Sequence, residues 1–150
     1  MASLFAFMHH IAAFALFAAL VVELILIREV LTVRTARRLQ IADMVFGIAA
    51  GVLLVVGFLR VYYFEKGATY YFHTWTFIAK LTLFVLVGLA SIVPTLEFLR
   101  WRKAVKQGQA PSLSPERVRT LRAIIHVELV GVVLIILMAA LMAKGVGLML

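Results

Sequence analysis

The chain contains four long apolar runs, and each of them carries ionisable residues at positions that lipid would cover. The runs are Leu4–Ile27, Ile41–Leu59, Trp75–Phe98 and Ala123–Ala143. A helix needs about 20 residues to cross the hydrocarbon core of a bilayer, so each run is long enough to span it. Because 65% of the 150 residues are hydrophobic, a soluble globular domain is excluded. We predict a single all-α domain over residues 1–150, an integral membrane up-down-up-down four-helix bundle with helices at about 4–38, 41–63, 73–104 and 115–146.

The basic residues are concentrated in two of the three predicted loops. The net charge is +8, and most of it lies after the first run and after the third run, whereas the middle loop holds Arg60 and Lys66. Basic loops stay on the cytoplasmic side, so both termini are expected outside. Charges placed in this way face anionic lipid headgroups, which makes the bilayer the expected partner and argues against nucleic acid. The absence of cysteine excludes disulfides and thiolate metal sites.

The predicted topology sorts the polar residues of the runs into two layers. A charge near the middle of a bilayer costs roughly 2.5 kcal/mol or more, so such residues usually face the bundle interior and mark a function. The outer layer contains His9, His10, His73 and Lys80. The inner layer, nearer the cytoplasm, contains Glu23, Asp43, Glu97, His126 and Glu128.

The outer layer supplies imidazoles and cations that suit a heme or another metal. At about 100° per residue, His9 falls on the small-residue face of the first helix and His10 on a lateral face, which favours His9 as the inward group. His73 and Lys80 share one face of the third helix, and His73 is a candidate second axial ligand. Arg60, Lys66 or Lys80 can pair with heme propionates. The alternative is that these side chains simply reach water or the outer headgroups.

The inner layer has two interpretations. Glu23, Asp43 and Glu128 can form ion pairs with arginines near the cytoplasmic surface and so lock the ends of the bundle. Those arginines are Arg28, Arg38 and Arg122. The alternative is a proton or substrate path, for which intramembrane carboxyls are suited. His126 and Glu128 are two residues apart, so only one of them can face the core squarely.

Three local motifs bear on packing. Gly47-Ile-Ala-Ala-Gly51 is a small-xxx-small pattern, which allows another helix or another subunit to approach closely. Ser114 is the expected N-cap of the fourth helix, with Pro115 at its first position. Pro94 is expected to kink the third helix. The sequence contains no phosphate-binding loop and no other motif of a soluble enzyme.

Several of these residues form a recognisable set of motifs. The set consists of His9-His10 with Glu23, the loop from Arg60 through Lys66-Gly67, Phe77 with Lys80-Leu81, Ser91 with Pro94-Thr95, and Trp101-Arg102. A chain with these motifs resembles a family of short bacterial membrane proteins known as domain of unknown function 2214. The resemblance covers most of the chain and implies a multi-pass protein of a bacterial inner membrane.

That family is distantly similar to the copper-resistance D membrane proteins and to the heme-containing bacterial protoporphyrinogen IX oxidases. Those oxidases carry a His-Ile pair near the start of helix one and a Lys-Leu pair in helix three. The corresponding pairs here are His10-Ile11 and Lys80-Leu81. This similarity implies a heme b near these positions, and it favours His10 where helical phase favours His9.

The sequence supports three functional hypotheses. The first is an inner-membrane protein that binds heme b in its outer half, with His9 or His10 as an axial ligand, and serves electron transfer or membrane redox chemistry. The second is copper handling or solute transport without heme, which would use Glu23, Lys80 and Glu128. The third is a structural subunit that assembles with further copies or with other membrane proteins.

Overall fold

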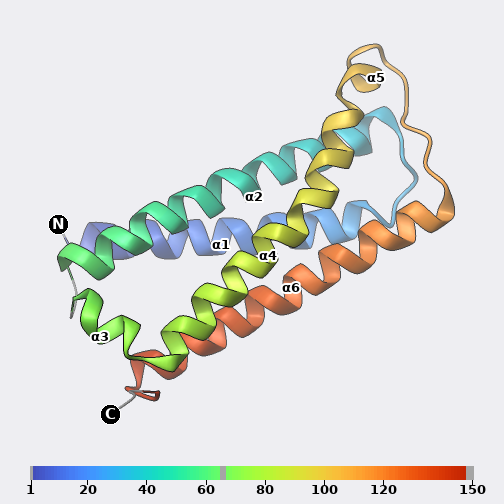
Figure 1. The fold of residues 1–150 in the computed structure, drawn as a ribbon. Helices are drawn as coiled ribbons and strands as arrows, with labels where there is room; N and C mark the ends of the chain where they lie inside the picture. Colours follow the sequence, from blue (N-terminus) through green and yellow to red (C-terminus); the bar gives the residue numbers. More distant parts are fainter. Residues whose placement is uncertain (1, 65–66, 148–150) are drawn as a thin grey trace.

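The computed structural model describes residues 2–64 and 67–147. Four long helices form the body of the molecule (Figure 1): α1 (Ala2–Leu26), α2 (Val33–Leu59), α4 (Trp75–Arg100) and α6 (Pro115–Ala143). Three short helices connect them: the π-helix η1 (Arg60–Phe64), α3 (Ala68–Phe72) and α5 (Arg102–Lys106). No strand occurs in the described ranges, and the prediction of an all-α bundle is confirmed.

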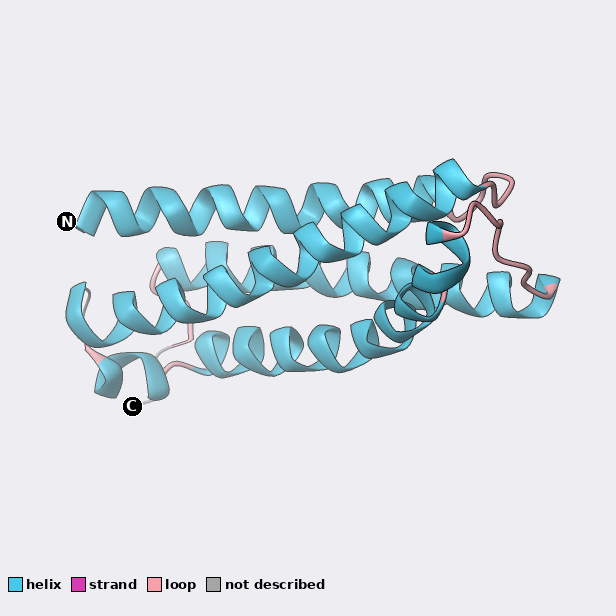
Figure 2. Ribbon diagram, turned by 90° about the horizontal axis from the view of Figure 1, so that it is seen from above, coloured by secondary structure: helices cyan, strands magenta, loops and turns pink. Residues whose placement is uncertain are grey.

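The long helices form two antiparallel pairs. α1 packs mainly against α2 and α4 mainly against α6, with smaller contacts between α1 and α6 and between α2 and α4. Figure 2 shows the long helices running side by side along one direction. The start of α1, η1, α3, the start of α4 and the end of α6 lie at one end of the bundle (Figure 1). We call it the aromatic end because Tyr62, Tyr70 and Trp75 belong to these elements. The loop 27–32 and the segment from α5 to the start of α6 lie at the opposite end, which we call the basic end.

Most of the surface of these helices points away from the bundle. Within the most apolar stretch of each long helix, between 17% and 28% of the residues are buried inside the chain. The outward faces carry large apolar side chains, among them Phe7, Phe14, Ile48, Leu89 and Ile136. Contiguous apolar surface of this extent needs lipid around it, and all four helices are long enough to cross a bilayer. The chain is therefore a multi-pass membrane protein.

The first helix ends earlier than the sequence predicts. The sequence predicts one helix over about 4–38, but α1 ends at Leu26 and α2 begins at Val33, not near residue 41. Thr32 is the N-cap of α2, because its backbone is extended and its hydroxyl oxygen accepts a hydrogen bond from the Thr35 N–H at 3.1 Å. Of the arginines expected at the end of the first helix, Arg34, Arg37 and Arg38 therefore occupy the first turns of the second, and Arg28 lies in the connecting turn.

The starts of the last two long helices lie close to the predicted positions. The predicted helix at 73–104 is α4 followed by the separate α5, with a turn at Trp101 between them. α6 begins at Pro115 as predicted, and the Ser114 hydroxyl accepts a hydrogen bond from the Arg117 N–H at 3.2 Å. The predicted N-cap of the fourth helix is confirmed.

The segment that follows α6 closes the aromatic end against the start of α4. Gly145 and Gly147 have positive φ angles of 77° and 104°, which turn the chain back toward the bundle. The Trp75 N–H donates to the carbonyl of Gly147 at 2.9 Å, and the Thr76 hydroxyl donates to the carbonyl of Val146 at 3.0 Å. The first of these bonds satisfies a helix-terminal N–H that has no partner within α4.

The tightest glycine packing between helices occurs at Gly131 and not at the predicted small-residue stripe. A Cβ at residue 131 would lie 2.5 Å from Cγ2 of Val87, so α4 and α6 pack closely where residue 131 has no side chain. At Gly47 and Gly51, a Cβ would have no other described part of the chain within 4 Å. The stripe therefore does not hold these helices together, and its packing against another subunit stays a prediction.

Candidate functional site: a buried carboxyl cluster

Three carboxyl side chains from three helices come together inside the bundle. Glu23 belongs to α1, Asp43 to α2 and Glu128 to α6; Glu23 and Glu128 are each 1% exposed, and Asp43 is half-buried. They are close enough for Asp43 and Glu128 to act electrostatically on Glu23, and for Asp43 to act on Glu128. The fourth long helix, α4, contributes Thr95, whose hydroxyl donates to Oδ1 of Asp43 at 2.6 Å. We call these four residues the carboxyl cluster.

The carboxyl cluster has no positively charged partner among the described residues. Oε1 of Glu23 and both carboxylate oxygens of Glu128 are buried and form no hydrogen bond there. The predicted ion pairs with arginine are therefore wrong. They would have involved Arg28, Arg38 and Arg122, all of which are exposed. His126 is exposed too, so Glu128 is the member of that pair that faces the core.

Helix geometry explains why the predicted ion pairs do not form. Arg38 precedes Asp43 by five residues, which corresponds to a rise of about 7.5 Å and a rotation of about 140° around the helix axis. The other two pairs, Arg28 with Glu23 and Arg122 with Glu128, are five and six residues apart. The arginines consequently lie at the surface of the basic end, while the carboxyls lie deeper and point in another direction.

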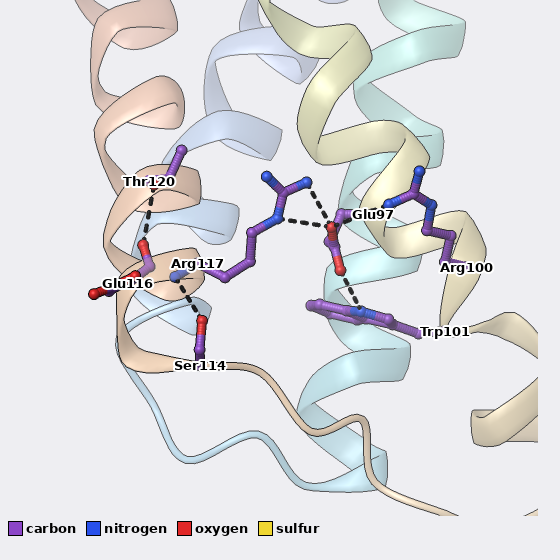
Figure 3. A network of polar contacts seen from close by, with 7 residues as sticks. All are labelled: Glu97, Arg100, Trp101, Ser114, Glu116, Arg117 and Thr120. Atoms are coloured by element: carbon purple, nitrogen blue, oxygen red, sulfur yellow. Dashed lines mark hydrogen bonds and ion pairs between the residues drawn. The ribbon is translucent and has the colours of Figure 1, made fainter.

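The ion pairs that do fasten the basic end are centred on Glu97 of α4 (Figure 3). Arg117, in the first turn of α6, donates from Nε and Nη2 to Oε2 of Glu97 at 2.9 and 2.7 Å. Trp101 Nε1 donates to Oε1 of the same carboxylate at 3.3 Å, and Nη1 of Arg100 lies 3.9 Å from Oε2. This network joins the end of α4 to the start of α6 across the long connection between them.

A groove on the outer surface between α4 and α6 reaches the carboxyl cluster. It has a volume of about 210 Å³, and Glu128 lines it. Its other lining residues are apolar: Leu83, Leu86, Val87, Ala90, Val127, Val130, Gly131 and Leu134. Because Leu86, Val127 and Val130 are exposed, the groove faces the lipid around the bundle. We call it the lateral groove. Glu128 belongs both to its lining and to the carboxyl cluster.

The two histidines of α1 point in different directions. The His9 ring is half-buried and packs beside Gly57 of α2, where a Cβ would lie 3.6 Å from Cε1 of the imidazole. His10 is exposed, and its Nδ1 lies 2.6 Å from the carbonyl oxygen of Ala6. Helical phase therefore correctly identifies His9 as the inward imidazole. His10, which the similarity to the oxidases favours, lies on the outside of the bundle.

The other predicted outer-layer residues lie away from the carboxyl cluster. His73 is exposed at the end of α3, with Nδ1 2.7 Å from the carbonyl oxygen of Thr69. The ammonium of Lys80 lies 5.2 Å from the ring centre of Phe77, and Arg60 begins η1. Lys66 lies outside the described residues. In the part of the chain that the structure describes, no group of three or more histidine or carboxylate side chains has the spacing of a metal site.

Four membrane-spanning helices around buried acidic residues define a multi-pass membrane protein. The chain belongs to the family described as "Predicted membrane protein (DUF2214)", whose model matches residues 1–147. The family resemblance drawn from the motifs is thus confirmed. No curated protein and no solved structure matches the chain. The similarity to copper-resistance D proteins and protoporphyrinogen IX oxidases stays a prediction.

Proposed function

We propose that the protein exchanges protons for a small cationic solute at the carboxyl cluster and acts as a proton-linked carrier in a bacterial inner membrane. One observation carries the proposal: Glu23 and Glu128 are buried side chains of different helices, and neither has a cationic partner among the described residues. Because basic loops stay on the cytoplasmic side of a membrane, we place the basic end of the bundle in the cytoplasm.

The energetics of a buried carboxylate support this role. An ionised carboxyl in an apolar site costs several kcal/mol unless a partner compensates it, and mutual repulsion among three carboxylates adds to that cost. A bound proton or a bound cation removes both the cost of burying the charge and the mutual repulsion. Either of them can leave again, because neither is part of the chain. Because Glu23, Asp43 and Glu128 belong to different helices, a change of occupant also alters how those helices pack. Intramembrane acids of this kind mark proton relays and substrate sites.

Proton movement in liposomes tests the proposal. Vesicles that contain the purified protein, an acidic lumen and an internal pH-sensitive dye are exposed in turn to sodium, guanidinium, tetramethylammonium and tetrabutylammonium chloride. These cations keep their charge, so they do not carry protons through lipid by themselves. We expect at least one of them to accelerate the loss of the pH gradient, and we expect Glu128→Gln to abolish that acceleration.

Glu116→Gln is the matched control for the Glu128 variant. Glu116 is an exposed carboxylate in the first turn of the same helix, so its replacement should leave proton movement unchanged. Two results contradict the proposal: none of the four cations changes the rate of proton loss, or Glu128→Gln responds to the cations as the wild type does.

Heme b binding in the outer half of the bundle, with an electron-transfer or redox role, is the second candidate function. The packing of the His9 ring against Gly57 favours it, because an axial imidazole must face the interior. His10 and His73 each place Nδ1 near a backbone carbonyl, so each would ligate a metal through Nε2. The lateral groove lies elsewhere and no histidine lines it. The residues present therefore supply one inward axial ligand.

Lys80 and Arg60 would be the charge partners of the heme propionates in this second candidate. An absorption spectrum tests it directly. Protein purified in mild detergent from heme-replete cells should show a Soret band, which His9→Ala should remove and His10→Ala should retain. The absence of the band from the wild type contradicts heme binding, whereas a band that survives both replacements contradicts the choice of ligand.

A further inference from the structure

We infer that the lateral groove binds an alkylammonium ion, a molecule with one apolar tail and one positively charged amino group, with Glu128 as its counter-ion. The inference rests on the proposed function. It adds the chemical class of the solute and the route by which the solute reaches the carboxyl cluster, which is sideways from the lipid.

The shape and lining of the groove suit an apolar tail. Apart from Glu128 its lining is aliphatic, and the outward side chains of Leu86, Val127 and Val130 form its outer part. A tail dissolved in lipid can enter such a groove without passing through water. The volume of about 210 Å³ is below the ~300–1,000 Å³ of pockets for drug-sized ligands. The groove therefore fits a single alkyl chain better than a molecule with several rings.

Two residues that line the groove carry hydrogen-bond acceptors without a partner in the helix, and these acceptors lie beneath the apolar lining. Both carboxylate oxygens of Glu128 are buried and form no hydrogen bond with the described residues. Ala90 also lines the groove, and its carbonyl lacks the usual helical donor because Pro94, four residues later, has no N–H. A primary ammonium carries three N–H donors together with its charge, so it complements both groups.

The charges around Glu128 also favour a cation. The other members of the carboxyl cluster are Glu23 on α1, Asp43 on α2 and the neutral Thr95 on α4. On α6 itself the nearest ionisable residues are Arg122 and His126, and both are exposed. Within the described part of the chain no cation reaches Glu128. An anionic ligand would meet repulsion there, whereas an ammonium supplies the missing charge.

Carbodiimide labelling of the wild-type protein in liposomes tests the inference. Dicyclohexylcarbodiimide dissolves in lipid and forms adducts with carboxyl groups in apolar surroundings, and mass spectrometry measures the modification of each carboxyl separately. We expect Glu128 to react before Glu23, because Glu128 lines the lateral groove and Glu23 does not. Octylammonium chloride should slow the modification of Glu128 several-fold, whereas octanol at the same membrane concentration should not.

A groove-filling variant gives a second readout. Ala90→Phe places a large side chain in the groove, so it should slow the labelling of Glu128 and weaken the protection by octylammonium. Leu89→Phe is the matched control, because Leu89 is an exposed neighbour on α4 that does not line the groove. The protection experiment on the wild type remains decisive even if the Ala90 variant folds poorly.

Three results overturn the inference: octanol protects Glu128 as well as octylammonium does, octylammonium gives no protection, or Glu23 reacts ahead of Glu128. The proton-flux assay fails or succeeds independently. If cations drive proton movement but octylammonium does not protect Glu128, the lateral groove is not the solute site and the proposed function stands. If octylammonium protects Glu128 but no cation moves protons, the binding site stands and the carrier function falls.

Discussion

The packing of α4 on α6 predicts a measurable cost for a single added methyl group at Gly131. A Cβ there would lie 2.5 Å from Cγ2 of Val87, whereas relaxed carbon–carbon contacts are about 3.5–4.0 Å, so one side must move by about 1 Å or more. Overpacking of this kind costs about 1–3 kcal/mol. Alanine recovers about 1 kcal/mol of helix propensity relative to glycine. We therefore expect Gly131→Ala to lower the free energy of unfolding by about 1 kcal/mol net.

Gly88→Ala is the matched control for this measurement. Gly88 also lies on the α4–α6 hairpin, but a Cβ there has no described atom within 4 Å, so the added methyl should be neutral or stabilise by up to about 1 kcal/mol. The free energy of unfolding can be obtained by titrating detergent-solubilised protein with dodecyl sulfate and following far-ultraviolet circular dichroism. The two glycine variants should differ by about 1–3 kcal/mol.

A compensating substitution separates a steric clash from other effects. Val87→Ala removes the methyl group that faces residue 131, so in the Val87→Ala background Gly131→Ala should lose most of its cost. If Gly131→Ala is no more destabilising than Gly88→Ala, or if Val87→Ala does not relieve it, the close packing of α4 on α6 is refuted.

Three further predictions concern contacts at the ends and centre of the bundle. Arg117→Ala removes the guanidinium that donates two hydrogen bonds to the buried Glu97, and it should lower the free energy of unfolding by about 1–3 kcal/mol. Arg117→Lys should cost less. An unfolding midpoint of Arg117→Ala equal to that of the wild type contradicts this prediction. Thr95→Val removes the hydroxyl that donates to Asp43, and it should lower the free energy of unfolding in the same titration by about 1 kcal/mol. Carbodiimide should then label Asp43 faster, and an unchanged labelling rate argues against this hydrogen bond. Gly147→Ala places a side chain at a φ of 104° and should speed amide hydrogen exchange at the start of α4, and unchanged exchange would show that the terminal segment does not protect it.

The architecture was predictable because helix length and bilayer thickness leave few alternatives for such a chain. The runs that begin at Ile41, Trp75 and Ala123 each lie within one long helix of the structure, and the run Leu4–Ile27 extends one residue past the end of α1. The N-cap at Ser114 was predictable too, since a capping hydroxyl followed by proline is a local signal.

The break between the first two helices was harder to predict. The segment from Arg28 to Arg38 holds neither proline nor glycine, so no strong local signal separates it from α1. The structure ends the helix at Leu26 and starts the next with the Thr32 cap, and a lone threonine is a weak signal in a sequence. Ile27 and Leu39 are buried in the same apolar cluster as Phe98 near the end of α4. Contacts between segments distant in the chain are not visible in sequence patterns.

The sequence predicts how deep the carboxyl groups lie in the membrane, but it does not predict which arginine each carboxyl would pair with. Counting residues from the basic loops places Glu23, Asp43 and Glu128 in one layer, and the structure brings them together. Which carboxyl meets which arginine depends on how each helix is rotated about its axis, and the sequence carries no direct information on that rotation. The ion pair of Glu97 with Arg117 was missed for this reason, because the two residues lie on different helices and 20 positions apart.

The infrared spectrum of the carboxyl groups tests most directly whether the carboxyl cluster holds exchangeable protons inside the membrane. Difference spectra of the protein in lipid nanodiscs, taken between acidic and alkaline buffer, report the C=O stretch of protonated carboxyls. We expect a band that changes between the two buffers in the wild type and in Glu116→Gln, and that is reduced in both Glu23→Gln and Glu128→Gln. If Glu23→Gln and Glu128→Gln both give the same difference spectrum as the wild type, a proton-binding role for the carboxyl cluster is contradicted.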